Sequence, residues 1–185
     1  LLLDSDALED QAAFSPDGES IVFVGSASGN AEIYLLPFRP RRTSSMRDAR
    51  NLTGNAGGDF RPVFSPDGRK LAFSSDRDLP IEVLNPITRF RSGDVYVLDM
   101  TGAASPQRLT DAPDWDGSPA WSPDGRSIAF YSERNSANVR PGVSGDQPAS
   151  IWIMSADGSQ QRALTSAAST TLSPAFLPDG RILFA

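Results

Sequence analysis

The side chains with the clearest chemical potential are three aspartates that gather around one tryptophan. Asp111, Asp114 and Asp116 share a short segment with Trp115. Carboxylates bind metal cations or pair with Lys and Arg, and an indole ring offers a stacking surface to a cation. The segment therefore predicts a carboxylate-lined site for a cation, a Lys or Arg side chain, or a polar ligand. The alternative is that these short carboxylates only cap turns by accepting backbone N–H groups.

Acidic residues also recur at one position along the chain. Asp59 stands three residues before Pro62, and Asp116 stands three residues before Pro119. Glu9 occupies the equivalent place further upstream, whereas Thr171 breaks the series. Two basic residues, Arg77 in Asp76-Arg77 and Arg134 in Glu133-Arg134, follow apolar segments at matching places. We expect these two arginines to pair with neighbouring structural units.

Composition excludes several kinds of chemistry. The 185 residues include no His and no Cys, which removes imidazole bases, disulfides, thiolate nucleophiles and the usual transition-metal ligands. We therefore expect no cofactor, no metal site and no catalytic residue within the chain. The formal net charge of −6 argues against a nucleic-acid partner. No apolar run approaches the roughly 20 residues of a membrane-spanning helix, so we expect no membrane insertion.

The elements that must position these side chains belong to an internal repeat. An aromatic residue followed by a Pro-Asp-Gly turn occurs four times, at spacings of 50, 57 and 55 residues. An apolar segment rich in β-formers follows each turn, and a further strand and a Leu-Thr pair complete each of the first three units. The four motifs are Phe14 to Gly18, Phe64 to Gly68, Trp121 to Gly125 and Phe176 to Gly180.

Four-stranded units with apolar middle strands indicate sheets that stack face to face. The sequence therefore predicts an all-β fold, a β-propeller of about three and a half four-stranded antiparallel blades that form an incomplete ring. We expect a single propeller portion over residues 1–185, with blades at about 9–53, 54–110 and 111–165 and a partial blade at 166–185. Further chain or a second copy would complete the ring. The four motif aromatics are expected to pack between blades.

Two further details follow from the repeat. Leu177 replaces the serine of the turn in the fourth unit, and the spacing there predicts a turn that is one residue tighter. Insertions at 76–93 and 133–149 fall on the rim opposite the Pro-Asp-Gly turns, which marks that rim as a binding face or as tolerant of surface insertions. The basic stretch 39–50 in unit one is expected to be a solvated or partly disordered loop. This insertion rim surrounds the mouth of the expected central channel of the propeller. The candidate binding residues on it are Asp59, Asp111, Asp114, Trp115, Asp116, Arg77 and Arg134.

The aromatic-Ser-Pro-Asp-Gly motif with its later Leu-Thr resembles the WD-like propeller repeat of the TolB family. The resemblance implies a non-catalytic binding or scaffolding propeller in the bacterial periplasm or cell envelope, with protein or peptidoglycan-associated partners. The same repeat occurs in propellers of the prolyl oligopeptidase family, which leaves a serine hydrolase with its catalytic domain outside this chain as the alternative. An oligogalacturonate lyase would need metal-binding His, which the chain lacks.

Overall fold

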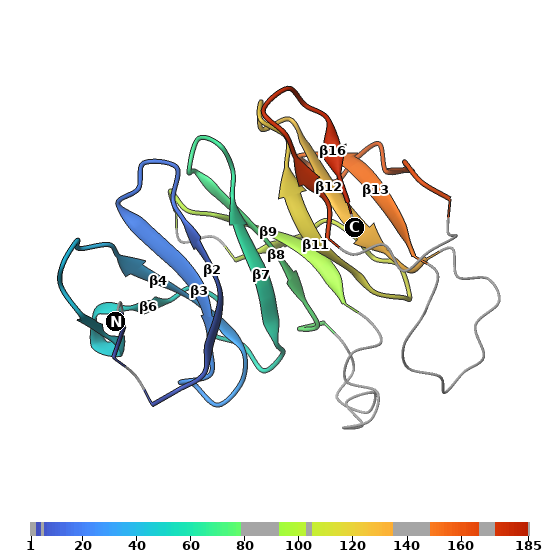
Figure 1. Ribbon diagram of the computed structural model, residues 1–185. Coiled ribbons are helices and arrows are strands. Elements are labelled where there is room, and N and C mark those ends of the chain that lie inside the picture. The colour runs from blue at the N-terminus through green and yellow to red at the C-terminus, as the bar shows by residue number, and fades with distance from the viewer. Residues whose placement is uncertain are drawn as a thin grey trace.

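The computed structural model describes residues 3–4, 6–78, 93–102, 105–134, 149–166 and 173–184. In these ranges the chain forms three four-stranded antiparallel sheets and one hairpin (Figure 1). The first sheet contains β2 Glu9–Phe14, β3 Ser20–Gly25, β4 Glu32–Pro37 and β6 Arg50–Asn51. The second contains β7 Asp59–Phe64, β8 Lys70–Ser75, β9 Asp94–Asp99 and β10 Gln107–Arg108. The third contains β11 Asp116–Trp121, β12 Ser127–Ser132, β13 Ser150–Ser155 and β14 Arg162–Ala163.

The remaining elements are short. The hairpin pairs β15 Ala175–Phe176 with β16 Ile182–Leu183, and β1 Leu3–Asp4 pairs in parallel with β5 Ser44–Ser45. One 3-10 turn, η1, spans Met46–Asp48. No helix in the described ranges is long and apolar enough to cross a membrane.

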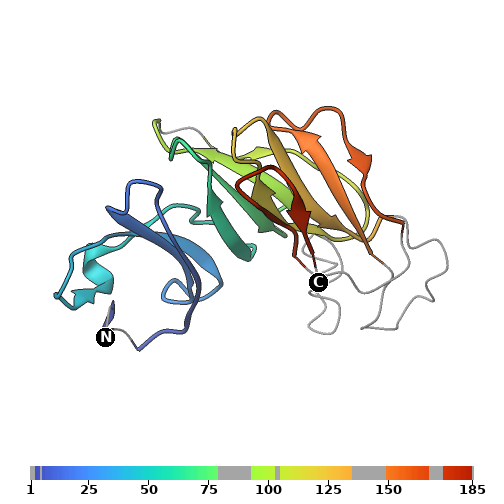
Figure 2. The ribbon, with the colours of Figure 1, turned by 45° about the horizontal axis from the view of Figure 1, so that its top comes forward.

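The sheets stack side by side as propeller blades do, and the ring they form is incomplete (Figures 1 and 2). Strand β7 packs against the first sheet, and β11 packs against β7, β8 and β9 of the second. Each sheet runs in chain order from an inner to an outer strand. The expected all-β propeller fold is confirmed.

The Pro-Asp-Gly turns lie on one rim, and the first three share one set of hydrogen bonds (Figure 1). In the first turn the Ser15 hydroxyl donates to the Asp17 carboxylate over 2.5 Å and accepts the Ser20 N–H over 2.9 Å. The second and third turns repeat the serine-to-aspartate bond at 2.6 Å. A Cβ placed on Gly68 would lie 3.6 Å from Pro16, so neighbouring turns are in contact. These bonds are local, which is why the motif is readable in sequence.

The fourth turn is tighter, as predicted. The Ser15 N–H donates to the carbonyl five residues on, at Ser20, whereas the Leu177 N–H donates to the carbonyl four residues on, at Arg181. Leu177 has no hydroxyl to bridge the turn. Its aspartate, Asp179, still accepts the Arg181 N–H over 3.1 Å. The turn therefore keeps its aspartate bond and loses its serine bonds.

The Leu-Thr pairs hold the short outer strands in place. The Thr53 hydroxyl accepts the backbone N–H of Ile33 over 3.0 Å. Thr110 and Thr165 make the same bond to the third strand of their own sheets, at 3.0 and 2.9 Å. A side-chain hydroxyl thus satisfies a donor that a two-residue strand cannot reach.

Asp94, at the start of β9, makes part of the fold's stability depend on pH. Its carboxylate accepts the Thr110 hydroxyl over 3.0 Å and pairs with Arg108 over 2.7 Å. Burial nevertheless raises the pKa of Asp94 from 3.8 to about 6. An acid whose pKa is raised on folding stabilises the fold below its unfolded pKa and loses that contribution as pH rises through the folded value.

We therefore expect Asp94 to add about 1 kcal/mol to the free energy of unfolding when the pH falls from about 7 to about 5. Urea denaturation of the parent protein and of Asp94→Asn at both pH values measures this contribution. The asparagine variant should lack it, while the contributions of other acids, which both proteins share, cancel in the difference. Equal pH slopes in the two proteins would contradict the assignment.

The core fills the spaces between sheets on both faces of the middle strands. Phe73 and Tyr96 pack toward Val22 of the first sheet, while Ala72 packs toward Phe130 of the third. This two-sided burial accounts for the continuous apolar runs of the middle strands. The aromatic rings of Phe73 and Tyr96 stack at 5.9 Å.

The motif aromatics do not all pack between blades. Trp121 is 7% exposed and donates its indole N–H to the Val63 carbonyl over 3.3 Å, and Phe64 packs against the first sheet. Phe14 is instead 56% exposed, so the expectation of a buried aromatic was wrong there. Its ring meets that of Phe38 edge-on, with the ring centres 5.0 Å apart. By equivalence with Phe64, Phe14 faces away from the second sheet, on the side where the described residues place no further four-stranded sheet.

The basic stretch of unit one has two parts. Residues 39–42 are exposed, as expected for a solvated loop. Met46 and Ala49 pack against the outward face of the first sheet, on the cluster of Phe23, Tyr34 and Leu36. Ser45 and Asp48 form a capping box at η1, which orders this part of the stretch.

Candidate functional site: a cavity at the channel mouth

The inner strands of the three sheets carry the same irregularity. In β2, β7 and β11 the register shifts so that two residues face one on the neighbouring strand, which is a β-bulge. The first of the two bulged residues takes a left-handed backbone conformation, with φ of 54° at Gln11, 53° at Arg61 and 52° at Ser118. Left-handed backbone is costly for a residue other than glycine. Its repetition in three sheets marks a position held by its surroundings, and such positions concentrate at functional sites.

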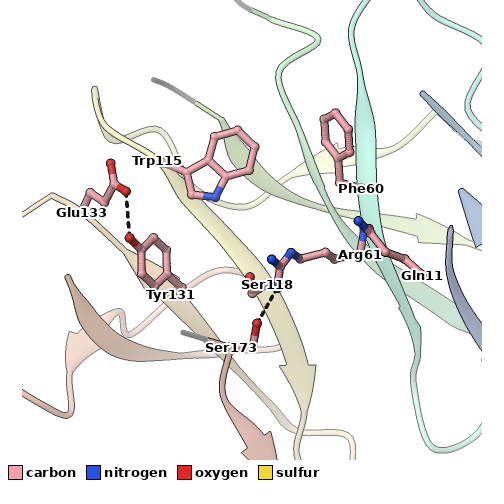
Figure 3. A pocket seen from close by; sticks show the side chains of 8 residues that line it. All are labelled: Gln11, Phe60, Arg61, Trp115, Ser118, Tyr131, Glu133 and Ser173. Atoms are coloured by element: carbon pink, nitrogen blue, oxygen red, sulfur yellow. Dashed lines mark hydrogen bonds between the residues drawn. The ribbon is translucent and has the colours of Figure 1, made fainter. Parts of the chain in front are cut away.

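The bulged residues line a cavity of about 410 Å³. Figure 3 shows their side chains meeting side chains from the third sheet and the fourth repeat. The described lining combines three aromatic rings with five polar side chains. The lining residues are Gln11, Phe60, Arg61, Trp115, Ser118, Tyr131, Glu133 and Ser173.

Arg61 joins three repeats across this cavity. Its guanidinium donates to the Ser173 hydroxyl, and its backbone N–H donates to the Gln11 side-chain oxygen over 2.6 Å. Ser173 stands just before β15, at the place that Arg61 occupies in β7. The cavity is therefore built from equivalent positions of successive repeats.

Trp115 forms one wall because two glycines leave room for its ring. A Cβ on Gly93 would lie 2.5 Å from the indole, and a Cβ on Gly117 would lie 2.5 Å from the indole nitrogen. Backbone bonds fix the segment, since the Trp115 carbonyl accepts the Glu133 N–H over 2.9 Å. The ring thus lies against backbone on one side and borders the cavity on the other (Figure 3).

Tyr131 and Glu133 form the wall opposite Phe60. The Tyr131 hydroxyl donates to the Glu133 carboxylate over 2.8 Å. Burial raises the pKa of Glu133, and the nearby charges of Asp114 and Asp116 raise it further. Burial and the Glu133 carboxylate also raise the pKa of Tyr131, so its hydroxyl remains a neutral donor.

Two of the sequence-predicted carboxylates are buried beneath the rim. The Asp59 side chain is fully buried and accepts a hydrogen bond from Arg77 over 2.8 Å. The Asp116 side chain is also fully buried and pairs with Arg134. Burial raises the pKa of Asp116, although Arg134 opposes the shift. Both ion pairs lie within one sheet, so the expectation that Arg77 and Arg134 pair with neighbouring blades was wrong.

Each of these arginines also contacts a serine and an aromatic ring of its own sheet. The Arg134 guanidinium donates to Ser132 over 2.9 Å and to Gln161 over 2.7 Å. It lies 4.4 Å from the centre of the Trp152 ring, and Arg77 lies 4.9 Å from that of Tyr96. The same Asp-Ser-Arg-aromatic arrangement occurs in two sheets, which indicates that each ion pair stabilises its own sheet.

The other predicted site residues lie at different places. Trp115 lines the cavity, whereas Asp111 is exposed and Asp114 is half-buried outside the lining. The insertions fall mainly on 79–92 and 135–148, outside the described residues. Within the described ranges no group of three His, Cys, Asp or Glu could hold a metal ion.

Sequence reasoning missed most of the cavity wall. Gln11, Arg61, Ser118 and Ser173 were not singled out, nor were Phe60, Tyr131 and Glu133. A signal was present for the first four, because each stands three residues before its motif aromatic. Because the residue types at this position differ, the repeat shows no common side chain there that would have indicated a shared role.

The chain is similar to proteins of two kinds. No family model matches it. It is 34% identical over 147 residues to a Protein TolB homolog of Chlorobium chlorochromatii, a match covering 63% of this chain and 32% of the relative. It is 31% identical over 134 residues to Dipeptidyl-peptidase 5 of Aspergillus fumigatus, covering 64% of this chain and 17% of the relative. The chain thus spans about a third or less of the curated relatives that it matches.

Solved structures show the same fold. TolB from Acinetobacter baumannii superposes with a TM-score of 0.65 at 29% identity, covering 92% of this chain and 35% of that one. A puromycin-hydrolyzing peptidase from Mycobacterium tuberculosis superposes with a TM-score of 0.69 at 17% identity, covering 100% of this chain and 29% of that one. The repeat motifs, the stacked four-stranded sheets and these likenesses agree: the chain is a TolB-like β-propeller with an incomplete ring.

Proposed function

We propose that this propeller is a non-catalytic binding protein that mediates protein–protein interaction in the bacterial cell envelope, with the cavity at the channel mouth as its docking site. The observation that carries the proposal is the convergence of equivalent residues from four repeats on one cavity, three of them at the bulges of inner strands. A concave site with aromatic walls and a few polar groups suits a side chain or a peptide segment.

The chemistry of the cavity supports binding over catalysis. No lining residue is a Cys, His or Lys, and neither Ser118 nor Ser173 has a histidine to activate it, since the chain contains none. Glu133 is engaged by Tyr131. The proposed location in the periplasm or cell envelope rests on the likeness to TolB proteins.

The experiment compares Trp115→Ala with Arg126→Ala. A partner captured by the parent protein from an envelope extract and identified by mass spectrometry is titrated against each purified variant by calorimetry. We expect Trp115→Ala to weaken binding at least about tenfold, because an aromatic anchor in a pocket dominates such interfaces. Arg126 is exposed on the opposite, Pro-Asp-Gly rim, so its removal should leave affinity unchanged. Unchanged affinity in Trp115→Ala, or a partner footprint on the Pro-Asp-Gly rim, would refute the proposal.

A second candidate is the propeller of a serine hydrolase of the prolyl oligopeptidase kind, supported by the 31% identity to Dipeptidyl-peptidase 5. The catalytic domain would then lie outside this chain, and the cavity would face peptide substrates. A serine hydrolase domain in the same coding sequence, together with peptidase activity of the full-length protein, would favour this candidate over the first.

A further inference from the structure

Among the described residues that line the cavity, Arg61 is the only cation. Within the described ranges it has no carboxylate partner, whereas Arg77, Arg108 and Arg134 each pair with an aspartate. A guanidinium carries five N–H donors. The bond to Ser173 engages one nitrogen and leaves most of the donor edge facing the cavity.

Arg61 is exposed, but contacts within the protein constrain both its backbone and the end of its side chain. The bulge in β7 sets its backbone at φ 53°, and the Gln11 side chain holds its N–H. Ser173 then anchors the end of the side chain. Figure 3 shows the Arg61 side chain extending across the cavity toward Ser118 and Ser173. A preorganised arginine loses little conformational entropy on binding an anion.

Glu133 does not serve as the missing partner. Its carboxylate accepts the Tyr131 hydroxyl, and Figure 3 shows both groups on the side of the cavity away from the Arg61 backbone. No ion pair joins Arg61 and Glu133. The cavity therefore presents an unneutralised guanidinium beside two aromatic walls.

We propose that Arg61 binds a carboxylate of the docked peptide, with an adjoining aromatic or apolar side chain packed on Trp115 and Phe60. This inference rests on the proposed function and names the chemistry that the partner must carry. The carboxylate is either the end of the partner chain or an Asp or Glu side chain. Arginine matches a carboxylate with two parallel N–H bonds, and the Ser118 hydroxyl adds a further donor at the same place.

Three capped dipeptides test the inference on the purified protein. N-acetyl-Trp-Glu-amide carries only a side-chain carboxylate, N-acetyl-Trp-Gln with a free end carries only a terminal one, and N-acetyl-Trp-Gln-amide carries none. NMR titrations follow the Arg61 Nε–H and Trp115 indole N–H resonances. We expect at least one acidic dipeptide to bind about tenfold more tightly than the neutral one, and the preferred acid identifies the source of the carboxylate.

Arg61→Gln is the informative variant, because glutamine already occupies the equivalent left-handed position at Gln11. It should abolish the preference for the acid and leave the weak binding of the neutral dipeptide. Arg69→Gln removes the same charge from an exposed site on the Pro-Asp-Gly rim and should keep the preference. A folded Arg61→Gln is verified by its unchanged NMR spectrum away from the cavity.

Equal binding of all three dipeptides, an acid preference that survives in Arg61→Gln, or no shift at any soluble concentration would each overturn the inference. Equal binding at Trp115 would overturn the role of Arg61 alone and leave the cavity as a docking site. If the acidic dipeptides bind more tightly but Trp115→Ala binds the protein partner with unchanged affinity, the proposed function is overturned. The inference that Arg61 binds a carboxylate would then still stand. The two failures are therefore distinguishable.

Discussion

Replacing Asp116 with alanine is expected to lower the free energy of unfolding by about 3 to 5 kcal/mol. The Asp116 side chain is fully buried and is the ion-pair partner of Arg134, whose side chain is 17% exposed. Removing one member of a buried pair leaves the other charge without compensation, and breaking such pairs typically costs about this much. Urea denaturation followed by tryptophan fluorescence measures the loss.

Asp111→Ala is the matched control for this change. Asp111 is an exposed carboxylate upstream of Asp116, and its removal should change stability by less than about 0.5 kcal/mol. Asp59→Ala, which breaks the equivalent pair with Arg77, should resemble Asp116→Ala. If Asp116→Ala unfolds at the same urea concentration as Asp111→Ala, the ion pair between Asp116 and Arg134 does not stabilise the fold.

Trp121→Ala is expected to lower the free energy of unfolding by about 3 to 5 kcal/mol, the usual cost of truncating a buried large aromatic. The ring packs in the cluster between the second and third sheets, beside Val97 and Phe130. Its indole N–H also bonds to the second sheet at Val63. The change therefore removes both packing and a hydrogen bond between two blades. Chemical denaturation gives the size of the loss.

Phe14→Ala changes the same motif position in the first sheet. Because the Phe14 ring is 56% exposed, its truncation should cost less than about 1 kcal/mol. A large loss in Phe14→Ala, or a small one in Trp121→Ala, would show that burial does not set the role of the motif aromatic.

The parts of the fold that were predictable depend on local bonds. Ser15 and Asp17 bond to each other and to their own turn, so the residues that make the turn are neighbours in sequence. Thr53 acts from a constant place in its repeat, so its spacing indicated the end of a blade. The continuous apolar sequence of the middle strands likewise predicted that both faces of each sheet are buried.

The parts that were missed depend on register and on neighbours. Arg134 reaches Asp116 because β11 and β12 pair in one register, which no single motif specifies. Gln11 and Arg61 adopt the left-handed backbone conformation. Glycine, asparagine or aspartate usually indicates this conformation in a sequence, and neither residue is one of these. Phe14 carries the same motif as Trp121, yet the described residues place no four-stranded sheet over Phe14, and its ring is 56% exposed where that of Trp121 is 7% exposed.

The repeated bulge confines the cavity-lining residues of successive blades to one position of the repeat. Each repeat contributes one side chain to the cavity from the same place, and the four now present are Gln11, Arg61, Ser118 and Ser173. The Ser-Asp turns and the Asp-Arg pairs that stabilise each blade occupy other places in the repeat. Gln11 and Ser173 both bond to Arg61, so these three positions would have to change as a set, whereas Ser118 could change by itself. Substitutions confined to this one position of the repeat would thus change which ligand the propeller prefers without altering the turns or the ion pairs of its blades.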